Sequence, residues 1–235
     1  MNIVNNLFHS TLGKKYIMAL TGAGLFGFAV MHMLGNLQIF LGPEVLNRYA
    51  HFLQSNKELL WPARLGLLVM VALHIWSAVK LSAENKAARP IGYLNDPTPA
   101  AASYASRTML MSGLIVAAFI IYHLLHFTVK VEAVNLVGRD FESLHVLNDA
   151  GSPIHNVHQM LVIGFQQPAV VVFYVIAVGL LCLHLSHGLS AMFQSLGLRS
   201  KTWWPVLQQS AKAAAFLLFL GYIAVPVAVL LRLVE

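Results

Sequence analysis

Five long apolar runs dominate the sequence and limit the folds that it can adopt. The chain is 58% hydrophobic and only 10% charged, with a mean hydropathy of +0.69, well outside the range of soluble globular proteins. A helix needs about 20 apolar residues to cross a bilayer, and each run is that long. The sequence therefore predicts an all-α membrane protein, a single domain over 1–235 with five transmembrane helices at about 15–41, 60–82, 106–130, 167–193 and 205–232.

The basic residues lie near the ends of these runs and indicate an orientation. They are not gathered in a patch with interleaved aromatic residues, so nucleic acid is not an expected partner. With a cytoplasmic N-terminus and a C-terminus outside, nine of the 15 Lys and Arg residues face the cytoplasm: Lys14, Lys15, Lys80, Lys86, Arg89, Arg107, Arg199, Lys201 and Lys212. Since Lys and Arg are retained on the cytoplasmic side, the sequence favours this orientation.

Each of the first four runs contains a histidine in its interior: His32, His74, His123 and His184. An ionisable side chain inside a membrane is costly, so it indicates a functional site. With a rise of 1.5 Å per residue, His32 lies about 26 Å along an outward helix and His74 about 20 Å along an inward one. His123 then returns to the outer level and His184 to the inner level. The sequence therefore predicts two pairs, each formed by alternate helices.

Two facing imidazoles are the axial ligands of a six-coordinate b-type haem. No Cys-x-x-Cys-His motif occurs, and Cys182 is the single cysteine, so a covalent c-type haem is excluded. Metal transport is a rival interpretation of membrane histidines, but transport sites usually add carboxylates or thiolates. The pattern favours two non-covalent haems b, each bound by two histidines and packed beside small residues such as Gly22 and Gly113.

Two spans contain a second histidine three residues later, His126 and His187. Residues at this spacing share a helix face, so both members of a doublet can point at a cofactor. An iron takes one ligand from each helix. We therefore expect His126 and His187 to bind the cofactor's propionates, a quinone or nearby polar groups, and His123 and His184 to bind iron, with His126 and His187 as the alternative iron ligands.

Six short motifs occur in order along the chain. They are GKK with MALTG at 13–22, HMLGNLQ at 32–38, SRTM at 106–109, YHLLHF at 122–127, HLSHGL at 184–189 and FQSLG at 193–197. With these motifs the chain resembles, over nearly its whole length, the cytochrome b membrane-anchor subunit of succinate:quinone oxidoreductases (succinate dehydrogenase and fumarate reductase). The resemblance is to the single-chain, five-helix type with two haems.

The resemblance implies a multi-pass protein of the bacterial cytoplasmic membrane that works in a respiratory complex of the tricarboxylic acid cycle. Its partners would be a flavoprotein subunit with FAD and an iron–sulfur subunit that docks on the cytoplasmic side, where the loop 83–105 is expected. The anchor would pass electrons between that subunit, the two haems and a quinone dissolved in the lipid. The family ligands fall on His32, His74, His123 and His184, paired first helix with third and second with fourth.

Several choices stay open at this point. The chain is similar to menaquinone-linked anchors, so menaquinone is expected, with ubiquinone as the alternative. A dihaem subunit of another respiratory enzyme, of the nitrate reductase or hydrogenase type, is a second possibility, and a haem-free anchor or transporter is a third. The direction of the reaction and the oligomeric state, including a higher oligomer of the complex, are also open.

A quinone needs donors to its two carbonyls near the hydrocarbon boundary. The candidates at span ends are Ser10, Lys14, Lys15, Tyr16 and Arg107 on the cytoplasmic side, and Arg48, Tyr49, His51, Glu58, Trp61 and Arg64 outside. Such residues are also the usual interface anchors of membrane helices.

Overall fold

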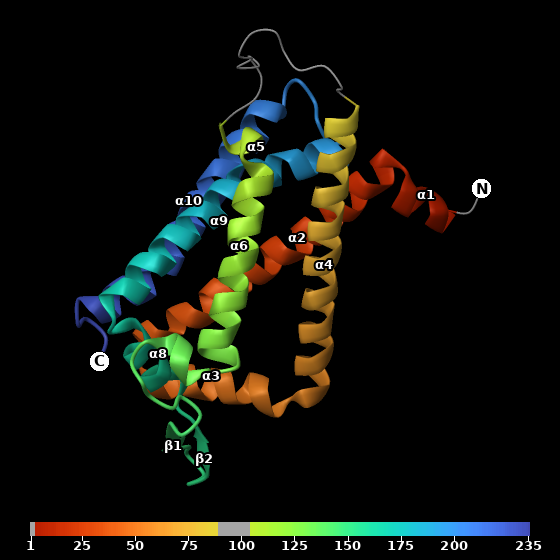
Figure 1. The fold of residues 1–235 in the computed structure, drawn as a ribbon. Coiled ribbons are helices and arrows are strands. Elements are labelled where there is room, and N and C mark those ends of the chain that lie inside the picture. The colour runs from red at the N-terminus through yellow and green to blue at the C-terminus, as the bar shows by residue number, and fades with distance from the viewer. Residues whose placement is uncertain (1–2, 89–103) are drawn as a thin grey trace. The chain divides into compact units, whose positions relative to one another are not determined.

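The computed structural model of the chain describes residues 3–88 and 104–235 and is almost entirely helical (Figure 1). The expected cytoplasmic loop falls largely on 89–103, outside the described residues. In chain order the elements are α1 (Ile3–His9), α2 (Thr11–Leu37), η1 (Gln38–Leu41), α3 (Pro43–Ser55), α4 (Lys57–Ala87), α5 (Tyr104–Arg107), α6 (Met109–His123), η2 (Leu124–Thr128), α7 (Glu132–Asn135), β1 (His145–Leu147), β2 (Pro153–His155), α8 (Val157–Phe165), α9 (Pro168–Ser195) and α10 (Trp204–Leu230).

Five helical segments are long and apolar enough to cross a membrane, and they confirm the prediction of an all-α protein with five spans. They are Thr11–Leu41, Lys57–Ala87, Met109–Thr128, Pro168–Ser195 and Trp204–Leu230. The second is longer than the expected 60–82 at both ends, because hydropathy marks only the apolar part of a helix whose hydrogen bonds continue into polar sequence. The third ends two residues before the expected 130, where a wide π-helical turn, η2, closes it.

The chain divides into two compact units, and every long helix contributes a segment to each. Unit 1 consists of 1–28, 65–114 and 182–216. Unit 2 consists of 29–64, 115–181 and 217–235.

Unit 1 begins with a tight turn between α1 and α2. The Ser10 hydroxyl accepts a hydrogen bond from the Gly13 N–H at 2.9 Å and donates to the Asn6 carbonyl at 2.6 Å. Ser10 is thus the N-cap of α2, and satisfies one of the free N–H groups at the helix start. A Cβ on Gly13 would lie 2.2 Å from the carbonyl oxygen of Leu7, so only glycine allows this close approach.

An ion pair joins α2 to α4 in the same unit. Lys14 is only 4% exposed, forms a salt bridge with Glu84 and donates to the His9 carbonyl at 3.1 Å. A buried ammonium group must be paired to be tolerated. These bonds therefore hold the first turns of α2 against the last turns of α4.

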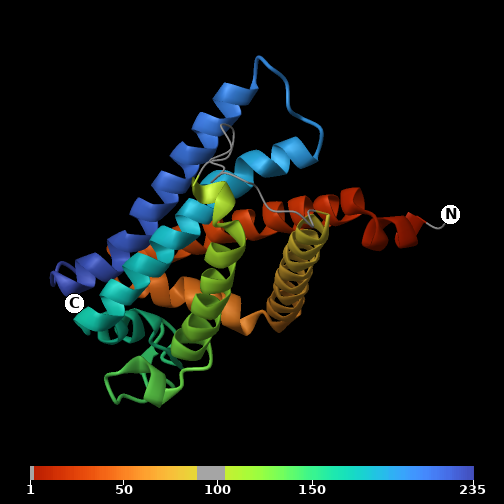
Figure 2. The same ribbon diagram turned by 45° about the horizontal axis from the view of Figure 1, so that its top comes forward.

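Unit 2 is organised around a buried asparagine of α3. The Asn47 amide donates to the Asn156 side chain at 3.1 Å, and its oxygen accepts from the His158 N–H at 2.9 Å. Asn156 in turn caps α8 by accepting from the Gln159 N–H at 3.0 Å. These bonds tie α3 to the start of α8, which lies beside it in Figure 2.

The sequence predicts a long loop at about 131–166, with Asp140, Glu142 and Asp149 on a solvated surface, and the structure differs from this in part. Asp140, Glu142 and Asp149 are exposed as expected, and Arg48 binds Asp149 at 2.9 Å. The helix α8 within it is instead mostly buried, with His158 only 6% exposed. Its apolar residues recur at helical spacing, which indicates a helix and not a loop.

A two-stranded hairpin completes this segment. Strands β1 and β2 pair antiparallel, and His145 lies opposite His155 with ring centroids 6.2 Å apart. Lys130 forms an ion pair with Glu142, and the hydrogen bond from Lys130 lowers the pKa of the Glu142 carboxyl. Burial lowers the pKa of His155, which favours the neutral imidazole beside that cation.

We predict that Gly164→Ala destabilises unit 2. The added Cβ would lie 2.7 Å from Phe127 Cε1, and that ring stacks on Phe141 with centroids 6.2 Å apart, so it has little room to move. Overpacking of this kind costs about 1–3 kcal/mol. Thermal denaturation of the detergent-purified protein should show a lower midpoint. Gly66→Ala is the control, because a Cβ there meets nothing within 4 Å, and equal midpoints for the two variants would contradict the prediction.

Candidate functional site

Unit 1 brings together His74 of α4 and His184 of α9. Their ring centroids are 6.4 Å apart and the ring planes cross at 64°. Two imidazoles on opposite faces of one metal, each bonded over about 2 Å, have centroids about 6 Å apart. The separation of this pair therefore suits two axial ligands of one iron.

Hydrogen bonds determine which nitrogen of His74 carries the proton. Its Nδ1 lies 3.1 Å from the Met18 carbonyl oxygen and 3.1 Å from Thr21 Oγ1. The Thr21 hydroxyl donates its own proton to the Ile17 carbonyl at 2.6 Å, so its oxygen is an acceptor. Since both partners accept, Nδ1 is the protonated nitrogen and Nε2 keeps its lone pair.

The same reasoning applies to His184. Its Nδ1 lies 3.2 Å from Ser112 Oγ, and that hydroxyl donates to the Met109 carbonyl at 3.1 Å. His184 therefore donates from Nδ1, and its Nε2 is free to bind a metal. A second ring nitrogen held by a hydrogen bond is the usual arrangement of metal-binding histidines, because it sets the tautomer and the ring orientation.

Two glycines allow these rings to pack against helix backbones. A Cβ on Gly22 would lie 3.2 Å from His74 Cε1, and one on Gly113 would lie 3.3 Å from His184 Cε1. Each glycine directly follows the hydroxyl residue that holds the ring. The pairs Thr21–Gly22 and Ser112–Gly113 thus position one imidazole each.

Unit 2 brings together His32 of α2 and His123 at the end of α6. Their ring centroids are 5.7 Å apart and the planes cross at 81°. The Asn36 amide nitrogen lies 3.3 Å from His32 Nε2 and donates to the His32 carbonyl at 2.8 Å. An amide nitrogen is only a donor, so His32 Nε2 also keeps its lone pair.

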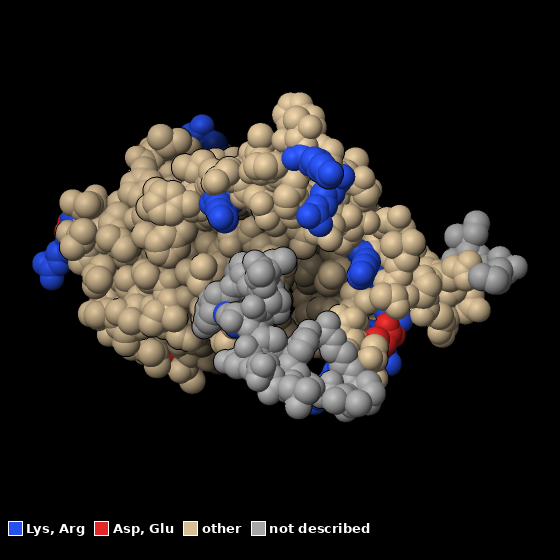
Figure 3. Space-filling model, turned by 90° about the horizontal axis from the view of Figure 1, so that it is seen from above, with Lys and Arg blue, Asp and Glu red and all other residues tan. Residues whose placement is uncertain are grey.

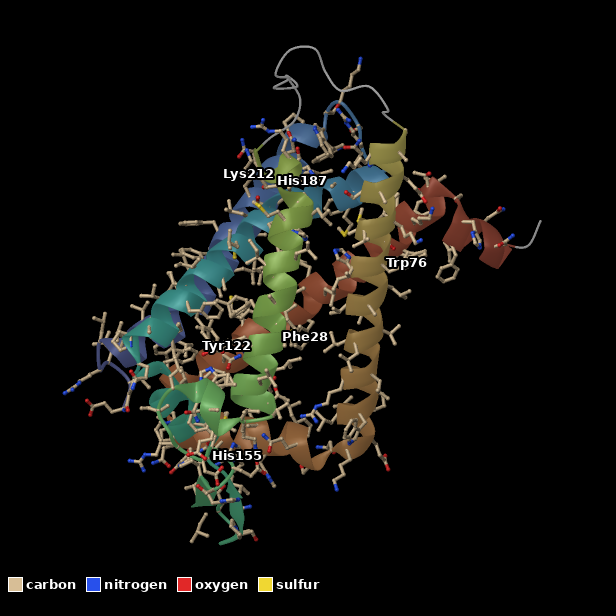
Figure 4. All side chains as sticks on the ribbon, in the orientation of Figure 1. Phe28, Trp76, Tyr122, His155, His187 and Lys212 are labelled. Carbon is tan, nitrogen blue, oxygen red and sulfur yellow. The ribbon has the colours of Figure 1, made fainter. Side chains whose placement is uncertain are left out.

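The second members of the doublets occupy different surroundings. His126 lies in η2, is completely buried, and has Nδ1 3.0 Å from the Tyr174 hydroxyl. It stacks on Phe127 with centroids 3.9 Å apart. His187, labelled in Figure 4, belongs to unit 1 and is half-buried on α9.

Tyr174 is a residue of this site that the sequence analysis missed. Its hydroxyl also lies 3.3 Å from His123 Nδ1, so it touches both histidines of the third span. A tyrosine hydroxyl in the interior of a span needs a hydrogen-bonding partner. That requirement was the available signal, but the sequence does not say which residue meets it.

Several of the quinone candidates have partners of their own in the structure. Ser10 caps a helix and Lys14 is paired with Glu84, as described above. Tyr49 packs on Gly35, where a Cβ would lie 2.9 Å from the tyrosine ring. Arg64 lies over the Trp61 ring at 5.6 Å. The remaining candidates, Lys15, Tyr16, Arg48, His51, Glu58 and Arg107, are exposed on their own helices.

Within 3–88 and 104–235 no group of three or more His, Cys, Asp or Glu side chains could hold a metal ion. Each histidine pair thus offers two ligands, and a porphyrin would add four nitrogens in the plane between them. The donor set, the centroid separations and the unprotonated Nε2 atoms of His74 and His184 fit a haem in each unit.

No protein-family model matches this chain, and no curated protein or solved structure matches it either. The evidence for its function therefore consists of the motifs, the five spans and the geometry of the histidines.

Proposed function

We propose that this chain is the membrane-anchor and electron-transfer subunit of a succinate:quinone oxidoreductase, with one haem b in each unit. The observation that carries the proposal is the presence of two histidine pairs, each with ring centroids about as far apart as two ligands of one iron require. The motifs that resemble the family include three of the four histidines, His32, His123 and His184. When bound, the haems would supply one-electron carriers between an iron–sulfur cluster and a quinone.

The residues of the chain would each have a defined task in this function. His74 and His184 would hold one haem through Nε2, and His32 and His123 the other. Thr21, Ser112 and the Met18 carbonyl keep the imidazoles of unit 1 in the tautomer that binds a metal. The apolar spans exclude water from the haems, and low polarity around a haem is one of the determinants of its potential.

The partners proposed are a flavoprotein subunit with FAD and an iron–sulfur subunit, bound on the cytoplasmic side, with menaquinone as the quinone. Figure 3 views the molecule from above and shows separate groups of Lys and Arg on a surface with few acidic groups. Such a surface suits a cytoplasmic face. Co-purification of the tagged chain from the bacterial cytoplasmic membrane with both soluble subunits would support the complex, whereas a molybdenum or nickel subunit would indicate another respiratory enzyme.

A reduced-minus-oxidised spectrum of the purified protein tests the proposal directly. We expect a b-type band and two haems per polypeptide. His74→Ala and His184→Ala should each remove one haem and leave the other, and His32→Ala and His123→Ala should do the reverse. His145→Ala, on the exposed strand β1, is the control and should keep both haems. The absence of a b-type band in the wild type would leave a haem-free anchor or transporter, and loss of the same haem in His32→Ala and His74→Ala would refute the pairing.

We predict that loss of the Ser112 hydroxyl weakens haem binding more than loss of the Thr21 hydroxyl. Ser112→Ala removes the hydroxyl that accepts from His184 Nδ1, whereas Thr21→Val leaves His74 bonded to the Met18 carbonyl. Loss of such a partner weakens metal binding by about 10–100-fold. Haem retained per polypeptide after detergent washing should therefore fall more in Ser112→Ala than in Thr21→Val. Ser190→Ala is the control, because that buried hydroxyl donates to the His187 carbonyl; equal retention in all three variants would contradict the assignment.

We further propose that the N-terminus is cytoplasmic and the C-terminus outside. Five spans place the two ends on opposite sides of the membrane, and nine basic residues against six favour this direction. Alkaline phosphatase fused after Glu235 should be active, and a cytoplasmic reporter at the same position should be silent. The opposite result would reverse the orientation without affecting the histidine pairs.

A further inference from the structure

Two histidines of one helix share a single tyrosine hydroxyl in unit 2. Tyr174 Oη lies 3.3 Å from His123 Nδ1 and 3.0 Å from His126 Nδ1. Tyr174 is only 6% exposed, and His126 is completely buried. The three side chains therefore form a hydrogen-bonded chain in which Tyr174 and His126 are buried and His123 is half-buried.

The hydrogen bonds from His123 through Tyr174 to His126 can run in only one direction once His123 binds a metal through Nε2. Its proton is then on Nδ1, which donates to the Tyr174 oxygen. The hydroxyl has one proton, so Tyr174 donates it to His126 Nδ1, the shorter of the two contacts. His126 accordingly carries its own proton on Nε2.

Among the residues that the structure describes, the last atom of this series of hydrogen bonds has no partner. His126 Nε2 is buried without a hydrogen bond, while the ring is held by Phe127 at 3.9 Å and by Phe141 at 5.8 Å between centroids. A buried polar group without a partner is destabilising, and a phenylalanine would fill this aromatic cluster without that cost. An imidazole adds one group that a phenylalanine lacks, an acceptor at Nδ1 for the tyrosine proton. This acceptor explains why a histidine occupies the position.

We infer that Tyr174 and His126 are positioning residues that set the basicity of His123, an inference that rests on the proposed haem function. An acceptor at Nδ1 increases the electron density that an imidazole gives to a metal through its other nitrogen. Tyr174 becomes a better acceptor when it donates its proton to His126, since successive hydrogen bonds strengthen one another. The combined effect stabilises the oxidised iron and lowers the potential of the haem bound by His32 and His123.

The two units differ in this respect. In unit 1 the hydroxyls of Thr21 and Ser112 donate to backbone carbonyls of their own helices. In unit 2 the hydroxyl proton goes to a second imidazole. The haem potentials can thus be set separately, by hydroxyls held by the backbone in one unit and by the tyrosine–histidine chain in the other.

Potentiometric titration of both haems in the intact complex tests the inference. Tyr174→Phe removes the hydroxyl and should raise the potential of the haem bound by His32 and His123, with the other haem unchanged. Tyr122→Phe is the matched control, because that hydroxyl donates to the Val134 carbonyl at 3.3 Å and its ring lies 6.0 Å from the Tyr174 ring. It should leave both potentials at their wild-type values.

His126 provides a second pair of variants. His126→Leu removes the acceptor and should move the same potential in the same direction as Tyr174→Phe. His126→Gln keeps an oxygen that can accept from the tyrosine and should restore the potential toward the wild type. If His126 had only a structural role, both variants would shift this potential equally.

The outcomes separate the inference from the function on which it rests. A wild-type protein without b-type haem refutes the proposed function. Wild-type potentials in Tyr174→Phe, with both haems bound, refute the inference alone. Loss of only the haem at His32 and His123 supports positioning by Tyr174. Loss of both haems means that this variant misfolds, and the comparison of His126→Leu with His126→Gln then decides.

Discussion

Inside a bilayer an imidazole N–H without a hydrogen-bonding partner is costly, and the contacts of His74, His184 and His123 follow from this constraint. An unpaired N–H in hydrocarbon costs on the order of several kcal/mol. His74 meets the requirement with a carbonyl and a threonine, and His184 meets it with a serine. Each partner occupies Nδ1. Because the hydrogen bond fixes the proton on Nδ1, Nε2 keeps its lone pair and is available to bind a metal.

This requirement limits which residues the neighbouring helix can have where it contacts the ring. A hydroxyl residue reaches the ring only if its helix comes close, and the residue after it must then be small. The distances from Gly22 and Gly113 to the two rings show this contact. Small residues are also what membrane helices use to approach one another, so the same glycine serves helix packing and ring placement together.

In unit 2 the N–H of His123 is bound by a longer series of hydrogen bonds, which runs through Tyr174 to His126. Its second histidine, His126, lies in the wide turn η2 and is enclosed by Phe127, Phe141 and Phe165. Single π-helical turns are often found at functional sites. The buried helix α8, capped by Asn156 and tied to α3 through Asn47, closes this part of the unit. The segment 131–166 thus contributes to the interior of unit 2 as well as to its surface.

Much of this protein could be predicted from the sequence, because the physics of a bilayer acts on composition and periodicity. The apolar runs determined the five helices, since a backbone in hydrocarbon has to bond within its own segment. The cost of an ionisable group in the membrane singled out His32, His74, His123 and His184. The small residues beside Thr21 and Ser112 were also visible as patterns, although not the rings that they hold.

Only the tertiary structure decided which groups form hydrogen bonds with each histidine. Tyr174 lies 51 residues from His123 along the chain, and no helical or strand period relates two such positions. The burial of α8 depends in the same way on Asn47, which is 109 residues from Asn156. Hydrogen bonds between distant segments arise from how helices pack and rotate, and that is set by the sum of many small side-chain contacts. The sequence alone determined where the costly groups are, and packing decided what satisfies them.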